Sequence, residues 1–321
     1  MAILILVHPQ ISHQPFAQSV PLNRNDSLQN ERNKLLYSFN SDNPPALSLQ
    51  EVSAEQVTKA LKAARSRDYE IATHQIRKHC KKMRALVRLV QKTNGEAESL
   101  YRFENAHYRR IADLLSGSRD AVSLHDALRK QLGDERFPAT AALLKSRIDN
   151  GDTQEALQQA RDLLRQGAQH VDTWDLTGLD RKNLMRGYAR SYRRTFKAME
   201  KALPDDDDGR MHTLRKRVKD QWYHTRLLQP LKPKKIGRRR ARLKTLASAL
   251  GDWRDLRLLC AFLASHKQVL SAEAEEELIP LLDAAQQRLA ELREVIGREC
   301  ELLFRHKRWK QQRLCKVPAP D

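Results

Sequence analysis

The sequence has few of the residues that mark disulfide-bonded or membrane-spanning proteins. Cysteine occurs four times and never in a Cys-x-x-Cys pair, so neither a disulfide framework nor a zinc site is indicated. No run of about 18 apolar residues is present, so a membrane-spanning helix is not expected. The apolar run at residues 3–7 is too short for a signal peptide and has no basic flank. We therefore expect a cytoplasmic protein with reduced thiols and no cofactor.

Signals for β-structure are also scarce. Apolar and polar residues do not alternate, and no Asn-Gly turn joins two strand-like runs. From residue 53 onward, apolar residues recur at helical spacing, which predicts an all-α protein of antiparallel helix bundles. The expected helices begin at residue 53 and continue over residues 69–93, 95–117, 119–133, 137–150, 152–167 and 179–204. A basic helix up to residue 229, a linker, a helix carrying residues 254–255, and a long helix over 271–305, bent near Pro280, should follow.

Basic residues outnumber acidic ones, with 59 Lys and Arg against 40 Asp and Glu, giving a formal net charge of +19. This charge predicts a polyanionic partner: nucleic acid, an anionic membrane surface or a phosphate polymer. The charge alone does not choose among them. Aromatic residues make up only 6% and do not interleave with the basic positions, so stacking platforms for nucleic-acid bases are not indicated.

A basic helical pattern occurs twice in the chain. Each copy reads His-x-x-Arg-Lys-x-x-Lys, followed seven positions later by Arg, and these positions share one face of a helix. The two copies are His74, Arg77, Lys78, Lys81, Arg88 and His212, Arg215, Lys216, Lys219, Arg226. The opposite faces are apolar, with Ile76, Cys80, Met83, Val87, Val90 in one copy and Leu214, Val218, Thr225, Leu228 in the other.

A second pattern repeats at nearly the same offset and indicates an internal duplication. Leu-x-x-x-Arg-Asp begins at Leu115 and again at Leu250, so that Arg119-Asp120 corresponds to Arg254-Asp255. We expect one domain over residues 49–312, with halves at 49–204 and 209–312. Residues 1–48 should form a loosely ordered extension, and residues 313–321 a C-terminal tail.

An acidic run, residues 205–208, separates the predicted halves. We expect a solvated turn whose carboxylates favour the N-terminus of the next helix. A metal site there would require the backbone to wrap four consecutive carboxylates around one ion.

Further basic residues extend the pattern. Lys82 and Arg84 join the first strip, and Arg186, Arg190, Arg193, Arg194, Lys197 form a third strip at steps of three and four. A basic stretch over residues 232–244, which includes Arg239, should be a flexible rim. A solvated helix face explains one such strip equally well, but several converging strips repel each other unless an anion neutralises them.

The two motif histidines allow more than one interpretation. Neither His74 nor His212 has a second metal ligand three or four residues later, because Arg and Lys occupy those positions. Our hypothesis is that both donate hydrogen bonds to phosphate and that a bound polyanion raises their pKa. The alternative is a packed or capping histidine.

Together, these motifs resemble the CHAD domain, a helical family associated with inorganic polyphosphate. The similarity rests on His74/Arg77, His212/Arg215 and the two Leu-x-x-x-Arg-Asp segments, with Tyr188 in the third basic helix and the stretch at residues 303–307 in addition. The resemblance implies two four-helix bundles related by a pseudo-two-fold, with the basic helices facing a central cleft. Asp220 and Trp222 depart from the first copy, which has Lys82 and Arg84 there, and the ExExK signature of a triphosphate tunnel domain is absent.

The resemblance and the strips together predict a non-enzymatic polyphosphate-binding module, associated with polyphosphate granules and with other proteins of polyphosphate metabolism. The binding residues should be His74, Arg77, Lys78, Lys81, Arg84, Arg88, Arg186, Arg190, Arg194, His212, Arg215, Lys216, Lys219, Arg226, Arg239, Arg305 and Lys307. Structural roles are expected for Arg119, Asp120, Arg254, Asp255 and Tyr188. The alternatives are a metal-dependent phosphohydrolase or kinase and a nucleic-acid-binding protein. Paired carboxylates for Mg²⁺ and a Gly-rich phosphate loop are missing from the strips.

Overall fold

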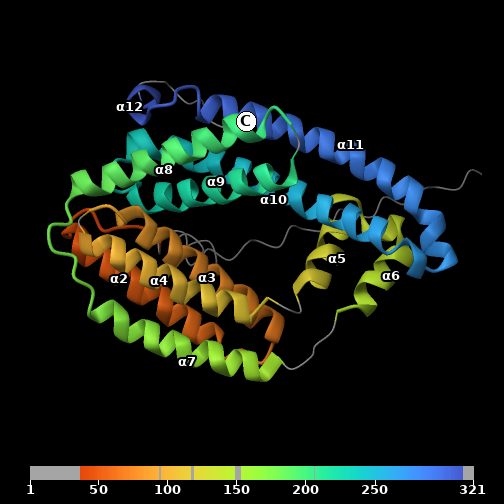
Figure 1. Ribbon diagram of the computed structural model, residues 1–321, viewed down its shortest axis with the longest axis horizontal. Helices are drawn as coiled ribbons and strands as arrows, with labels where there is room; N and C mark the ends of the chain where they lie inside the picture. Colours follow the sequence, from red (N-terminus) through yellow and green to blue (C-terminus); the bar gives the residue numbers. More distant parts are fainter. Residues whose placement is uncertain (1–36, 94, 117–118, 149–152, 206, 314–321) are drawn as a thin grey trace, which may run out of the picture. The chain divides into compact units, whose positions relative to one another are not determined.

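The computed structural model describes residues 37–313 except 94, 117–118, 149–152 and 206, and within this part every regular element is helical (Figure 1). The α-helices are α2 (Pro45–Ala63), α3 (Tyr69–Val90), α4 (Gly95–Leu114), α5 (Arg119–Gln131), α6 (Pro138–Ser146), α7 (Thr153–Asp172), α8 (Arg181–Ala202), α9 (Asp208–Leu228), α10 (Pro233–Ser265), α11 (Ala272–Leu303) and α12 (Trp309–Gln312). Two short 3-10 helices are η1 (Asp134–Arg136) and η2 (Lys267–Val269). The predicted all-α class is confirmed for the described residues. None of their helices is long and apolar enough to cross a membrane. Residues 1–36 of the predicted N-terminal extension lie outside the described residues. The prediction of a loosely ordered extension was wrong for its described part, because Tyr37 and Phe39 are buried and α2 begins at Pro45, before the predicted helix start at residue 53.

Several helices begin at a capping side chain. Asp68 accepts a hydrogen bond from the backbone N–H of Ile71 at the start of α3, and Asp180 does the same at the start of α8. In the acidic turn, Asp207 accepts from the N–H of Arg210 at 2.7 Å and so caps α9. This cap confirms the prediction that the turn's carboxylates favour the next helix.

The apolar backs of the two basic helices lie in the core, as their periodicity predicts. Ile76, Cys80, Met83, Val87 and Val90 of α3 are buried, as are Leu214, Val218, Thr225 and Leu228 of α9. Burying this many apolar side chains supplies the main stabilisation of such helices, because each one removed from water contributes about 1.5–3 kcal/mol. Cys80 and Cys300 are free and buried, as expected for packed thiols.

The helices pack in groups that cross the predicted halves. The helices α2, α3, α4 and α7 each pack on two others of this set and so close a four-helix bundle. Helices α5 and α6 instead pack on α10 and α11, where Leu128 and Leu144 share a separate apolar core with Leu259. Helices α8 and α9 pack on each other, with α9 also on α10, and both contact α3. The two matched motif pairs, α3 with α9 and α5 with α10, are each in contact.

Some predicted boundaries were wrong. The expected linker after residue 229 is helical from Pro233, so the basic stretch and the Arg254-Asp255 segment belong to one helix, α10. Helix α7 continues through Gly167, its predicted end, and the absence of a side chain there lets Tyr108 of α4 approach closely. A Cβ on Gly167 would lie 2.8 Å from the hydroxyl oxygen of Tyr108.

Candidate anion-binding site

Helices α3, α8 and α9 meet at a small pocket whose lining includes four arginines. We call it the arginine pocket. It is lined by Arg88, Gly187, Arg190, Ser191, Arg194, Arg217, Asp220 and His224. The first predicted strip contributes Arg88 to its wall and the third contributes Arg190 and Arg194, whereas the lining residues from α9 lie outside the second predicted strip.

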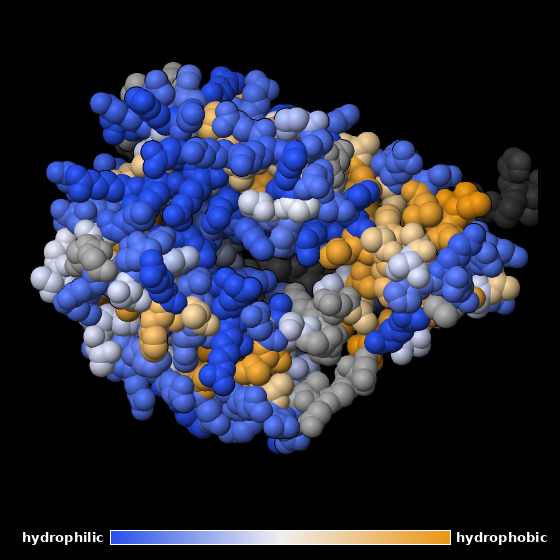
Figure 2. Space-filling view, viewed as in Figure 1, coloured by the Kyte–Doolittle hydropathy of each residue, from blue (hydrophilic) through white to orange (hydrophobic). Residues whose placement is uncertain are grey.

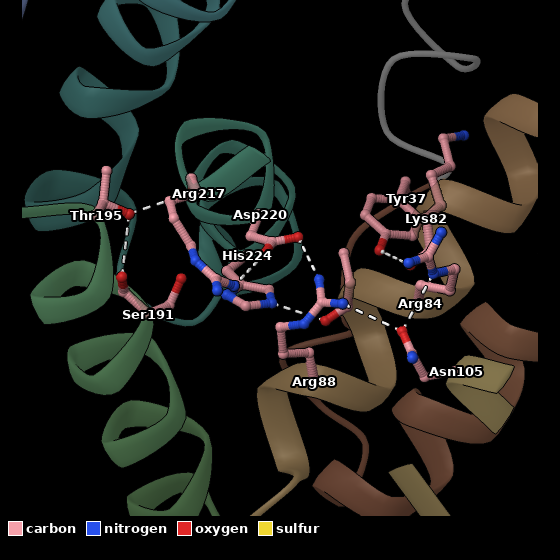
Figure 3. Close-up of polar contacts among 11 residues, drawn as sticks. Tyr37, Lys82, Arg84, Arg88, Asn105, Ser191, Thr195, Arg217, Asp220 and His224 are labelled. Carbon is pink, nitrogen blue, oxygen red and sulfur yellow. Dashed lines mark hydrogen bonds and ion pairs between the residues drawn. The ribbon is translucent and has the colours of Figure 1, made fainter. Parts of the chain in front are cut away.

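Arg88 is held in the pocket from two sides (Figure 3). Its Nη1 donates to Oδ1 of Asp220 at 2.6 Å, and its Nη2 donates to Oδ1 of Asn105 on α4 at 3.1 Å. The same oxygen of Asn105 accepts from Nε of Arg84 at 3.1 Å. Burial lowers the pKa of Arg88, but Asp220 and Tyr101 counteract it and the net shift is upward. Asn105 thus positions two arginines of α3, and no sequence pattern marked it.

The wall formed by α8 comes unusually close to α3. A Cβ on Gly187 would lie 2.0 Å from the carbonyl oxygen of Leu89, so only glycine permits this packing. One turn later, Arg190 Nη2 donates to the same carbonyl oxygen at 3.4 Å. Burial and then Arg194 lower the pKa of Arg190, and burial and then Arg217 lower that of Arg194. The guanidinium groups of α8 and α9 therefore repel each other.

His224 closes the pocket beside α3. The imidazole is buried, and its Nε2 lies 2.7 Å from the carbonyl oxygen of Ala85, to which it donates (Figure 3). Burial lowers its pKa to about 4, so the ring is neutral near pH 7. Sequence reasoning missed His224, because it falls outside the His-x-x-Arg pattern.

Positive charge continues from the pocket along the front of α9. Burial, then Arg254, Arg109, Arg84 and Arg217, lower the pKa of Lys216. His212 has a pKa lowered to about 4 by burial and then by Arg254, Lys216 and Arg215. Basic side chains from α3, α4, α9 and α10 therefore share one region, and Arg109 and Arg217 were not predicted as members of it.

Figure 2 shows hydrophilic residues over most of the visible face around α3, α4, α8 and α9, while apolar residues gather around α5, α6 and the adjoining ends of α10 and α11.

A sequence model of the CHAD domain matches residues 49–264, more than half of the chain. The chain belongs to the CHAD family. No curated protein matches the sequence. The matched span of the CHAD domain begins at the predicted residue 49 and ends within α10, although α11 packs against α10 beyond that point.

The remaining predicted binding residues of the CHAD domain lie in different settings. Exposed ones are His74, Lys78, Lys81, Arg186, Lys216, Arg305 and Lys307. Arg77 donates to the carbonyl oxygen of Ala112. Lys219 and Arg226 pack over the ring of Trp222, at 5.1 and 5.2 Å from its centroid. Arg215 lies near Lys216 and His212 and lowers the pKa of His212.

The prediction that the basic stretch with Arg239 forms a flexible rim of the site was wrong. Arg239 is only 2% exposed, and its guanidinium lies over the rings of Tyr192, Phe304 and Trp309 at 5.5, 5.6 and 5.1 Å. The basic stretch forms a helix, so this position faces the core and its cation is stabilised by aromatic faces. In this structure Arg239 is therefore not available to a ligand.

Lys82 also does not lie on the basic face predicted for the first strip. It is buried, and its Nζ donates to Oε1 of Gln56 at 2.9 Å. Burial, then Arg226 and Lys78, lower its pKa to about 7. Its position on α3 turns it away from the face that carries Arg84 and Arg88.

The residues with predicted structural roles are partly described. Tyr188 is fully buried, and its hydroxyl lies 3.0 Å from that of Thr225 on α9. Burial raises the pKa of Asp255, while Arg215 and Arg254 oppose this shift. The side chains of Arg119 and Asp120 lie outside the described part of the structure. Within that part, no group of three or more His, Cys, Asp or Glu residues could hold a metal ion.

Proposed function

We propose that this CHAD domain binds inorganic polyphosphate along the basic faces that meet at the arginine pocket, and that it acts as a binding module and not as an enzyme. The observation that carries the proposal is the convergence of guanidinium groups from α3, α8 and α9 on one pocket. Burial and then repulsion from neighbouring guanidinium groups lower the pKa values of Arg190 and Arg194 there, and a bound anion would relieve this repulsion.

Polyphosphate fits this surface chemically. It offers about one negative charge per unit and no base edges, so its receptor needs a row of cationic donors and no sequence code. Arginine supplies forked donors for paired phosphate oxygens, and Lys216 supplies compact charge next to them. A bound polyanion would also raise the low pKa of His212 and allow it to donate to phosphate.

The proposed architecture is a duplicated domain with a pseudo-two-fold around a basic cleft. Its support is that each repeated motif packs on its own counterpart, α3 on α9 and α5 on α10. Elements related by a two-fold axis meet in this way when they lie next to the axis. On this proposal, the domain would recruit proteins of polyphosphate metabolism to polyphosphate granules in the cytoplasm.

The test is a titration of polyphosphate against a triple variant, Arg190→Ala, Arg194→Ala and Lys216→Ala. We expect the affinity to fall by at least about tenfold, because each lost charged contact contributes to binding. The matched control is Arg129→Ala, Arg165→Ala and Lys145→Ala, which removes the same charges from α5, α7 and α6. The control should keep nearly wild-type affinity.

Equal loss in both triple variants would contradict the proposal and assign the affinity to net charge. Double-stranded and single-stranded DNA serve as competitors at constant salt. Displacement of polyphosphate by an equal charge concentration of DNA would favour a nucleic-acid partner. Steady release of phosphate from polyphosphate by the purified protein, abolished by EDTA, would favour the enzymatic alternative.

A further inference from the structure

The arginine pocket already contains an anionic group of the protein itself. Oδ1 of Asp220 accepts from Arg88 at 2.6 Å, and Oδ2 lies 3.8 Å from Nη1 of Arg217 (Figure 3). Asp220 is the acidic residue among those that line the pocket in the described structure. Its side chain is 14% exposed and that of Arg88 15%, so this pair is shielded from bulk water. Ion pairs of this kind are screened less by salt than exposed ones.

Asp220 also occupies a position at which the two copies of the basic pattern carry side chains of opposite charge. The corresponding residue of the first copy is Lys82, which turns away and donates to Gln56. On α9 the matched position turns towards the pocket and carries a carboxylate. The sequence therefore replaces a cation by an anion at the point where the three helices meet.

A phosphate that enters the pocket must compete with this carboxylate. A phosphate oxygen within hydrogen-bond distance of Arg88 would lie close to Asp220, and like charges at such a separation repel strongly in a partly buried site. A short phosphate in the pocket would depend on it for most of its contacts. A long chain would reach beyond the pocket to Lys216 on the front of α9 and Arg254 in α10, whose charges lie close enough for Arg254 to lower the pKa of Lys216.

We infer that Asp220 is a built-in counter-anion that selects long polyphosphate over short phosphates by competing for the guanidinium groups of the arginine pocket. The inference rests on the proposed function of this site. Asp220 holds Arg88 in position while the pocket contains no ligand, and it weakens the binding of small anions such as orthophosphate and tripolyphosphate. Long chains lose little affinity, because the competition affects only one part of the surface that they bind.

The test compares Asp220→Asn with the wild type in titrations with tripolyphosphate and with long-chain polyphosphate. Asparagine keeps an oxygen that can accept from Arg88 but removes the charge. We expect the affinity for tripolyphosphate to rise by about tenfold and that for long chains by less than about threefold, so that selectivity falls. Asp220→Glu retains the charge and should retain wild-type selectivity.

The matched control is Asp162→Asn on α7, which makes the same change in net charge at an exposed ion pair with Arg165. An unchanged ratio of the two affinities in Asp220→Asn would overturn the inference while leaving the proposed function intact. An equal gain in Asp162→Asn would overturn it too, because net charge would then explain the effect. Failure of the wild type to bind long-chain polyphosphate would overturn both proposals. Unfolding curves for each variant ensure that folded protein is compared.

Discussion

At the scale of single residues, Glu104 is a carboxyl group buried away from the arginine pocket. Its Oε1 accepts from Nε1 of Trp174 at 3.0 Å, and Oε2 has no hydrogen-bond partner. Nδ1 of His170 on α7 lies 3.6 Å from Oε1 of Glu104. The ring of His107 on α4 packs against the rings of His170 and Tyr108, and Tyr108 lies close to Glu104. Burial raises the pKa of Glu104 from 4.5 to about 7, so the folded protein favours the neutral acid.

The pH dependence of stability follows from this shift. Between pH 4.5 and about 7 the folded state keeps a proton that the unfolded state has released, so the free energy of unfolding falls as pH rises through this range. We expect a loss of about 3 kcal/mol in the wild type relative to Glu104→Gln, which cannot ionise. Urea unfolding of both proteins at a series of pH values measures this difference. Parallel curves would show that Glu104 is ionised in the folded protein.

Residue placement is where prediction from the sequence succeeded least. The helical period placed Arg84, Arg88 and Arg190 on basic faces, and they lie around or beside the pocket. The same period could not place Arg239, because its burial depends on aromatic residues in α8, in α12 and just after the end of α11. The sequence pattern did not predict Asn105 for a similar reason, because its role comes only from the packing of α4 on α3.

At the scale of elements, the contact between α8 and α3 depends on Gly187. A β-carbon there would overlap the carbonyl oxygen of Leu89, so Gly187→Ala must push the two helices apart. We expect a loss of about 2 kcal/mol or more in the free energy of unfolding, together with weaker polyphosphate binding, because Arg190 and Arg194 would move from Arg88. Chemical denaturation and titration measure the two effects.

Gly297→Ala in α11 is the control for this substitution. The nearest atom that its Cβ would meet is Nη1 of Arg293, at 3.9 Å, which is an ordinary van der Waals distance, so the methyl group fits without a clash. Alanine has the higher helix propensity, and this variant should be as stable as the wild type or more stable by up to about 1 kcal/mol. Similar losses in both variants would mean that the close approach at Gly187 is not what stabilises the interface.

The sequence predicted which segments form helices, but it did not predict which helices pack on each other. Apolar periodicity identified the buried faces of α3 and α9. The predicted end of the first basic helix at residue 93 was slightly too late, because α3 ends at Val90, and Gly95 is the first residue of α4. The association of α5 and α6 with α10 and α11 could not be read from the same pattern, because periodicity shows that a face is buried but not against which helix.

At the scale of the whole molecule, the net charge of +19 makes binding depend on salt. Polyanion binding releases counterions, so we expect polyphosphate affinity to fall by about a thousandfold or more between about 50 and 200 mM salt. The logarithmic slope should be smaller in the Arg190, Arg194 and Lys216 triple variant, which makes fewer phosphate contacts. It should be unchanged in the Arg129, Arg165 and Lys145 control. Identical slopes in all three proteins would show that Arg190, Arg194 and Lys216 do not contact phosphate.

The packing of α5 and α6 on later helices has a consequence during synthesis. A ribosome delivers Leu128, Phe137 and Leu144 well before Leu256, Leu259 and Leu281, which complete their apolar core. The nascent chain must therefore carry these side chains without their final partners until α10 and α11 have emerged. Release of the chain after α9 would leave this surface permanently open and prone to aggregation.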